Sequence, residues 1–149
     1  TKDFAGEEVV VVGVLKGSFI FCADLIREMK LPVILDFISV SSYEGTESTG
    51  ELKVNLDIKT NIEGKNVILV EDIIDTGLTI SSLVETFKKS SPKSLKVASL
   101  LYKPARLKHE VDIDYLAFEI EDHFVIGYGL DFNGLYRELP YVGIYDGEV

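Results

Sequence analysis

Residues 67–79 read VILVEDIIDTGLT, which joins an apolar strand, an acidic pair and a small polar loop. The four leading apolar residues are typical of a strand covered on both faces, as in a parallel sheet. Glu71 and Asp72 follow at its carboxyl end, where open α/β sheets bind their ligands. The loop from Asp75 to Thr79 offers backbone N–H groups, threonine hydroxyls and a glycine at the start of a helix, a combination that cradles phosphate.

The acidic pair would repel phosphate unless another group intervenes. Glu71 and Asp72 therefore imply either ligand hydroxyls, such as a ribose diol, or a Mg2+ ion that reverses the local charge. The plainer alternative is a helix cap at 75–77 beside two solvated carboxylates, but the thirteen-residue arrangement as a whole favours a function. The loop is not a Walker loop, because the second glycine and the following lysine are missing.

Strand-like and helix-like segments alternate along much of the chain. Residues 9–15 form an unbroken, mostly β-branched apolar run, which predicts another strand buried on both faces. Further strands are predicted over 32–40, 66–70 and 95–102, and helices over 18–29 and 80–89. This alternation predicts an α/β fold with a mostly parallel sheet.

Two regions depart from this alternation. The segment 41–52 is long, polar and glycine-containing, which is typical of a lid or a disordered loop. The segment 53–58 alternates polar and apolar residues, which predicts a half-exposed strand. The last third is strand-rich with short connections, over 114–117, 124–128 and 141–145. Because no repeat or linker divides the chain, we expect a single domain over residues 1–149.

The composition of the chain excludes several classes of function. The 149 residues carry 15 Lys and Arg against 25 Asp and Glu, a net charge of -10, and 46% are hydrophobic, as in a globular protein. The acidic balance argues against a nucleic-acid surface. Cys22, His109 and His123 are too few for a disulfide framework, a cysteine-based zinc site or a histidine-rich metal site. No apolar run reaches the roughly 18 residues that a membrane helix needs, so we expect no membrane partner.

The stretch from Val70 to Thr79 resembles the phosphoribosyl diphosphate (PRPP) motif of type I phosphoribosyltransferases, and its acidic form resembles their hypoxanthine-guanine branch. The resemblance spans Val9 to Ile144. It implies the type I phosphoribosyltransferase fold, with helices flanking a mostly parallel sheet, a small hood subdomain from the C-terminal segment and a mobile lid at about 41–52. It also implies purine salvage by a pentosyltransferase, which moves the 5-phosphoribosyl group from PRPP to N9 of hypoxanthine or guanine and yields IMP or GMP plus pyrophosphate.

The resemblance assigns residues to PRPP. Glu71 and Asp72 are expected to face the ribose hydroxyls and Mg2+, with Asp131 near a second Mg2+. The 5′-phosphate is expected on the loop made of Asp75, Thr76, Gly77, Leu78 and Thr79. Pyrophosphate is expected on Lys16, Gly17 and Arg137, beside a Leu15–Lys16 peptide bond that can be cis.

The resemblance also assigns residues to the purine. Asp75 is expected to exchange a proton with N7, and Lys103 to contact the 6-oxo group, so both are candidate catalytic residues. The other expected purine contacts are Ile73 packing on the base, Phe124 stacking on it, the Val125 backbone reading its edge and Asp131 near its exocyclic group. Ser41, Ser42 and Tyr43 are expected to open the lid that excludes water.

The resemblance further implies a cytoplasmic homodimer or homotetramer that binds no nucleic acid. Two other functions stay open. A catalytically weak relative that binds nucleotides and RNA is disfavoured by the acidic charge and by the presence of Asp75 with Lys103. A receiver-type signalling domain shares the acidic pair and a Lys103-Pro104 step, but it needs a phospho-accepting aspartate at the end of an intervening strand, and 95–102 supplies none.

Overall fold

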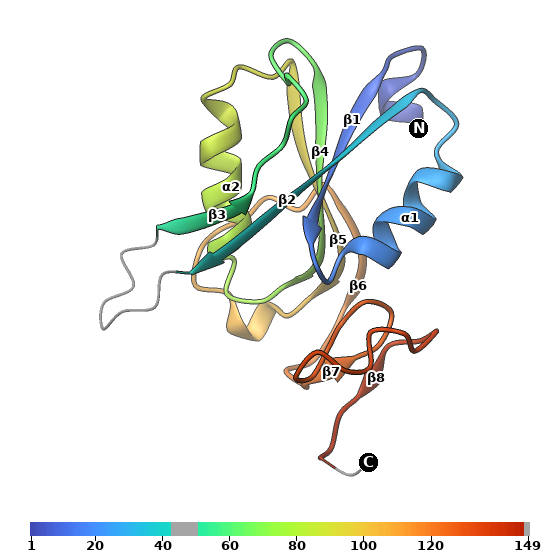
Figure 1. The fold of residues 1–149 in the computed structure, drawn as a ribbon, viewed down its shortest axis with the longest axis vertical. Helices are drawn as coiled ribbons and strands as arrows, with labels where there is room; N and C mark the ends of the chain where they lie inside the picture. The colour runs from blue at the N-terminus through green and yellow to red at the C-terminus, as the bar shows by residue number, and fades with distance from the viewer. Residues whose placement is uncertain (43–50, 148–149) are drawn as a thin grey trace.

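The computed structural model describes residues 1–42 and 51–147. Its centre is a six-stranded sheet in the order β3-β2-β1-β4-β5-β6 (Figure 1). The strands are β1 (Val9–Leu15), β2 (Val33–Ser42), β3 (Leu52–Leu56), β4 (Asn66–Ile74), β5 (Ser94–Tyr102) and β6 (Tyr115–Glu119). Every neighbouring pair is parallel except β2 with β3. The predicted α/β fold with a mostly parallel sheet is therefore confirmed.

Two helices cover opposite faces of this sheet, α1 (Phe19–Glu28) and α2 (Leu78–Lys88). Val10 and Val12 of β1 belong to the same buried cluster as the apolar side of α2, including Leu83. Val9 and Val11 point the other way and share a cluster with Cys22 of α1. Because successive strand residues face opposite sides, an apolar run without alternation is what a doubly covered strand requires.

A second, two-stranded antiparallel sheet joins β7 (Val125–Ile126) to β8 (Gly143–Ile144). Figure 1 shows it below the six-stranded sheet, close to the C-terminus. Both strands are shorter than predicted, and for β7 the reason is local, since Gly127 and Tyr128 adopt φ of 90° and 52° and leave the extended conformation. We call residues 124–147 the hood segment. The Tyr128 hydroxyl donates to the carboxylate of Asp24, which ties the hood segment to α1.

The connections differ from the predictions in two places. β4 runs on to Ile74 instead of ending at Val70, so the acidic pair lies within the strand. Ser41 and Ser42, predicted to open the lid, are strand residues that pair with β3. Tyr43 and residues 44–50 of the predicted lid lie outside the described residues. Two 3-10 turns, η1 (Lys2–Phe4) and η2 (Pro104–Arg106), complete the described elements.

Within residues 1–42 and 51–147, no helix combines the length and the apolar character needed to cross a membrane.

Candidate active site

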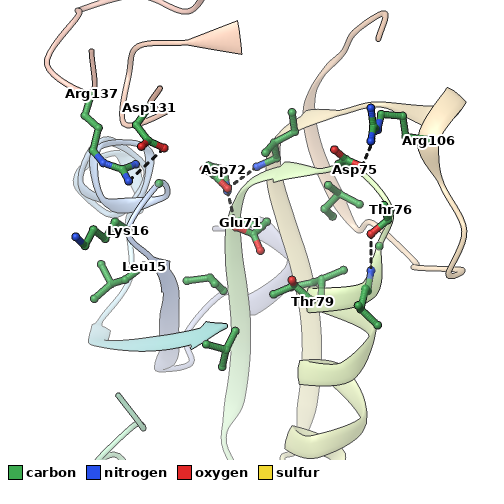
Figure 2. A pocket seen from close by; sticks show the side chains of 18 residues that line it. Leu15, Lys16, Glu71, Asp72, Asp75, Thr76, Thr79, Arg106, Asp131 and Arg137 are labelled. Atoms are coloured by element: carbon green, nitrogen blue, oxygen red, sulfur yellow. Dashed lines mark hydrogen bonds and ion pairs between the residues drawn. The ribbon is translucent and has the colours of Figure 1, made fainter. Parts of the chain in front are cut away.

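A cavity of about 450 Å³ opens where β1 and β4 end, between the sheet and the hood segment (Figure 2). β1 and β4 are adjacent and parallel, and the helices that follow them cover opposite faces, so this is the point where α/β sheets bind ligands. Twelve predicted site residues line the cavity: Lys16, Gly17, Glu71, Asp72, Ile73, Asp75, Thr76, Gly77, Leu78, Thr79, Asp131 and Arg137. The structure thus brings together segments that lie far apart in the sequence.

The loop at the start of α2 has the geometry of an anion site. Gly77 is the N-cap of α2 with φ +83°, and a Cβ placed there would lie 2.3 Å from the carbonyl oxygen of His109. The first N–H groups of a helix have no partner within it and carry its positive dipole end, which suits phosphate. The loop is supported from outside the helix, because the Thr76 carbonyl accepts from the backbone N–H groups of Lys108 and His109, both at 2.9 Å.

The turn after β1 lies against the acidic pair. The Leu15–Lys16 peptide bond is cis, as the resemblance implied. A Cβ added at Gly17 would lie 1.7 Å from Oδ2 of Asp72, and one added at Gly129 would lie 2.3 Å from the carbonyl oxygen of Gly17. Glycine at these two positions therefore lets β1, β4 and the hood segment meet at one wall of the cavity.

Glu71 is a buried carboxyl group, with 7% of its surface exposed. Its burial, followed by the negative charge of Asp72, raises the pKa of Glu71 well above the ordinary value. Glu71 Oε1 accepts from the Asp72 backbone N–H at 3.1 Å, and Asp72 Oδ1 accepts from the Ile73 N–H at 2.7 Å. The pair presents fixed oxygens at the cavity wall, where ligand hydroxyls can donate to them.

Glu71, Asp72 and Asp131, the residues expected near Mg2+, do not form a single cluster of three carboxylates in the described part of the chain. Across the described ranges, no group of three or more His, Cys, Asp or Glu side chains is placed to hold a metal ion. Asp131 lies instead 3.3 Å from Arg137, measured from Oδ1 to Nη2, and its Oδ2 accepts from the Gly134 N–H. Glu71 and Asp72 still fit Mg2+, which proteins commonly hold through one or two carboxylates together with substrate oxygens and water.

Arg137 enters the cavity wall from the hood segment. Its Nη1 donates to the carbonyl oxygen of Gly129 at 2.6 Å, which fixes the guanidinium close to the Gly17 turn. Arg137 and Lys16 give the cavity cations at the end opposite the loop of α2 (Figure 2).

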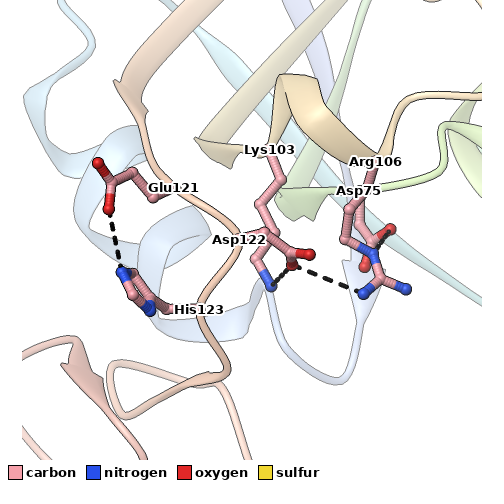
Figure 3. Close-up of polar contacts among 6 residues, drawn as sticks. All are labelled: Asp75, Lys103, Arg106, Glu121, Asp122 and His123. Carbon is pink, nitrogen blue, oxygen red and sulfur yellow. Dashed lines mark hydrogen bonds and ion pairs between the residues drawn. The ribbon is translucent and has the colours of Figure 1, made fainter.

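A row of four alternating charges borders the other end of the cavity (Figure 3). Arg106 Nε lies 3.2 Å from Asp75 Oδ1, and Arg106 Nη1 lies 3.5 Å from Asp122 Oδ1. The same Asp122 oxygen lies 3.8 Å from the ammonium of Lys103. The carboxylates of Asp75 and then Asp122 raise the pKa of the Arg106 guanidinium. Arg106 and Asp122 were not among the predicted site residues, and the local signal for Arg106 is its position three residues after Lys103.

The remaining predicted purine residues do not line this cavity. Lys103 is buried, and it is linked to the cavity-lining Arg106 through Asp122. Phe124 is half-exposed and meets the ring of Phe132 edge to face, with centroids 5.8 Å apart. Val125 lines a separate, mostly apolar cavity of about 720 Å³ between β5, β6 and the β7–β8 sheet. The structure therefore places the phosphate and ribose residues together and leaves part of the predicted purine set outside.

Comparison with known proteins identifies the family. The family model described as "Phosphoribosyl transferase domain" matches residues 1–133. The hypoxanthine-guanine phosphoribosyltransferases of Staphylococcus aureus and Staphylococcus epidermidis are each 45% identical over 150 residues, covering 100% of this chain and 84% of theirs. The crystal structure of a hypoxanthine-guanine phosphoribosyltransferase from Bacillus anthracis matches with a TM-score of 0.93 and 52% identity, over 97% of this chain and 85% of that one. A hypoxanthine phosphoribosyltransferase structure from Trypanosoma cruzi matches with a TM-score of 0.91 and 40% identity, over 96% and 79%. The chain belongs to the phosphoribosyltransferase family, in its hypoxanthine-guanine branch.

Proposed function

We propose that this chain transfers the 5-phosphoribosyl group of PRPP to N9 of hypoxanthine or guanine, forming IMP or GMP and releasing pyrophosphate. One observation carries the proposal. A single cavity is lined by a helix N-terminal loop, an acidic pair and a cationic turn, which are complementary to the phosphate, the ribose diol and the pyrophosphate of one substrate. The relatives named above favour this enzyme over the RNA-binding and receiver-type alternatives.

PRPP is held at three separate points in this proposal. The loop from Asp75 to Thr79 binds the 5′-phosphate through backbone N–H groups and hydroxyls, and Lys16, Gly17 and Arg137 bind the pyrophosphate. Glu71 and Asp72 lie between these two anion sites and accept from the ribose hydroxyls (Figure 2). Fixing both ends of PRPP orients C1 toward the base, which lowers the entropic part of the barrier.

The purine is proposed to bind beyond Asp75. Asp75 exchanges a proton with N7, which is general acid–base catalysis and requires hydrogen-bonding reach. Lys103 binds the 6-oxo group, and its cation favours an oxo acceptor over the amino group of adenine. The other proposed purine contacts are Ile73, Phe124, Val125 and Asp131.

A divalent metal completes the proposed chemistry. When bound with PRPP, Mg2+ would supply positive charge to neutralise the departing pyrophosphate. Glu71 and Asp72 are the proposed protein ligands, and Asp131 is the proposed contact of a second ion. The burial of Glu71 beside Asp72 supports this, because two adjacent carboxyl groups at a cavity wall are stabilised by a cation.

The remaining proposals rest on the sequence pattern and on family membership. These are a single domain over residues 1–149, a lid that includes Ser41, Ser42 and Tyr43, a homodimer or homotetramer, and a cytoplasmic location. Size-exclusion chromatography with light scattering tests the oligomeric state, and a monomer would contradict it.

The central test is a spectrophotometric assay with PRPP, Mg2+ and one purine at a time. We expect product with hypoxanthine or guanine and none with adenine. Asp75→Asn should lower kcat by about 100-fold or more, the usual contribution of a general acid–base group, and leave the KM for PRPP within about threefold. Lys88→Gln is the control, since it removes an exposed ion pair with Glu85 at the far end of α2. Absence of product with every 6-oxopurine would refute the proposed function.

A further inference from the structure

Arg106 contacts both carboxylates in the row of four charges beside the cavity. Its Nε contacts Asp75, which lies in the β4–α2 loop. Its Nη1 contacts Asp122, which lies in the segment between β6 and β7. Asp122 in turn contacts Lys103 at the end of β5. The two groups proposed to meet the purine, Asp75 and Lys103, are thus joined through Arg106 and Asp122 (Figure 3).

The contact with Arg106 holds one oxygen of Asp75 and leaves the other available. Oδ1 accepts from Arg106 Nε at 3.2 Å. Among the residues that the structure describes, Asp75 Oδ2 has no hydrogen-bond donor, and Asp75 lines the cavity. A carboxylate fixed through one oxygen has a defined plane, so the other oxygen has a defined direction.

We propose that Arg106 is a positioning residue that sets the orientation of the Asp75 carboxylate and its spacing from Lys103 for proton exchange with the purine. This inference rests on the proposed function, because it requires Asp75 to be the proton-transfer group. Arg106 itself acts through Asp75 and Asp122 and takes no part in the proton transfer.

The guanidinium geometry explains why arginine suits this position. Arg106 presents donors in a rigid planar fork, so it can address two carboxylates in two directions at once. A lysine ammonium is a single point of charge on a flexible stem and cannot fix both. Lysine at this position would therefore keep the charge but lose part of the orientation.

A purely structural role predicts a different result. The side chains of Arg106 and Asp75 are 48% and 37% exposed, and ion pairs this exposed add little to stability. Misplacement of a catalytic group by about 1 Å, in contrast, can lower turnover by roughly 100-fold. Loss of the Arg106 side chain should therefore reduce activity far more than it reduces the melting temperature.

The first experiment compares variants at Arg106. We expect Arg106→Gln to lower kcat by about 10- to 100-fold, with the KM for PRPP within about threefold and a melting temperature close to that of the unmodified chain. Arg106→Lys should recover part of the loss. Lys88→Gln again serves as the control, as it breaks an ion pair that is at least as exposed. An unchanged kcat in Arg106→Gln would overturn the inference.

The second experiment is a double-mutant cycle with Asp75→Asn. If Arg106 acts through Asp75, Arg106→Gln should change kcat by no more than about twofold once Asp75 is already asparagine. The same 10- to 100-fold loss in both backgrounds would overturn this inference and leave the proposed function standing. Asp75→Asn with unmodified turnover would overturn both. If Arg106→Gln does not fold, the same double-mutant cycle with Asp75→Asn is measured with Arg106→Lys, or with Asp122→Asn, in place of Arg106→Gln.

Discussion

The close packing behind the phosphate loop makes Gly77→Ala a quantitative test of the site. Gly77 has φ +83°, and a Cβ there would lie 2.3 Å from the backbone oxygen of His109. Gly64 offers a matched control, since it has φ +70° but no atom within 4 Å of its added Cβ. Both substitutions place an alanine at a positive φ, which is unfavourable for a residue with a Cβ. Only Gly77→Ala also brings the new Cβ into collision with a backbone atom.

The magnitude follows from these distances. An alanine in the left-handed region costs about 1–2 kcal/mol at either site. Ordinary contact begins at 3.4 Å, so at Gly77 the Cβ and the His109 oxygen must separate by a further 1.1 Å. That movement disturbs the two hydrogen bonds to the Thr76 carbonyl, each contributing about 0.5–1.5 kcal/mol. We therefore expect a loss of about 2–5 kcal/mol for Gly77→Ala and about 1–2 kcal/mol for Gly64→Ala.

Thermal unfolding and steady-state kinetics measure the two consequences. At roughly 3 °C per kcal/mol for a chain of this length, Gly77→Ala should lower the Tm by about 9 °C and Gly64→Ala by about 4 °C. Displacement of the loop should raise the KM for PRPP at least about tenfold in Gly77→Ala only. Equal Tm losses, or an unchanged KM for PRPP in Gly77→Ala, would refute this account of how the loop is supported.

Three further predictions follow from other parts of the molecule. EDTA should abolish purine transfer and added Mg2+ should restore it, so activity that persists in EDTA would contradict the metal assignment. Burial raises the pKa of the Cys22 thiol to about 11, so Cys22 in the folded protein should resist a thiol-specific disulfide reagent. The unfolded protein should react once per chain, because the sequence has one cysteine. Fast reaction of the folded protein would contradict the burial of Cys22. Burial and then a neighbouring carboxylate raise the pKa of Tyr115 and of Tyr128 to about 12, from an ordinary value of 10. Folded protein retains these protons more tightly, so their contribution to stability is complete below pH 10 and is lost as the pH rises toward 12. Ultraviolet titration should show two late tyrosines, one of which disappears in Tyr128→Phe; the same late signal in that variant would contradict the assignment.

The bounds of a strand are predicted correctly where burial alone decides them. β1 has the predicted bounds because its residues are buried on both faces, which produces an unbroken apolar run. The apolar run 67–70 predicts a strand that ends at Val70, with the acidic pair following it. β4 continues to Ile74 because Glu71 and Ile73 pair with Ser99 and Leu101 of β5, and that pairing depends on the neighbouring strand.

In the site, too, local features could be predicted from the sequence and contacts between distant segments could not. The loop from Asp75 to Thr79 could be predicted because its residues are contiguous and their chemistry is local. The contacts of Arg106 with Asp75 and Asp122 join segments separated by 31 residues and by a further strand, and no local pattern signals them. Sequence patterns identify groups that bind a ligand directly, whereas groups that orient those groups become visible only in three dimensions.

The support behind the phosphate loop has an evolutionary consequence. Lys108 and His109 hold the Thr76 carbonyl through backbone N–H groups, and the Lys103 N–H holds the carbonyl of Ile74 in the same way. Any residue other than proline supplies such an N–H group, so substitutions at 108 and 109 can accumulate without loss of support. An insertion or deletion between residues 104 and 108 would instead shift the N–H donors of Lys108 and His109 out of line. Related enzymes should therefore vary freely in residue type at positions 108 and 109 while keeping the length of this segment.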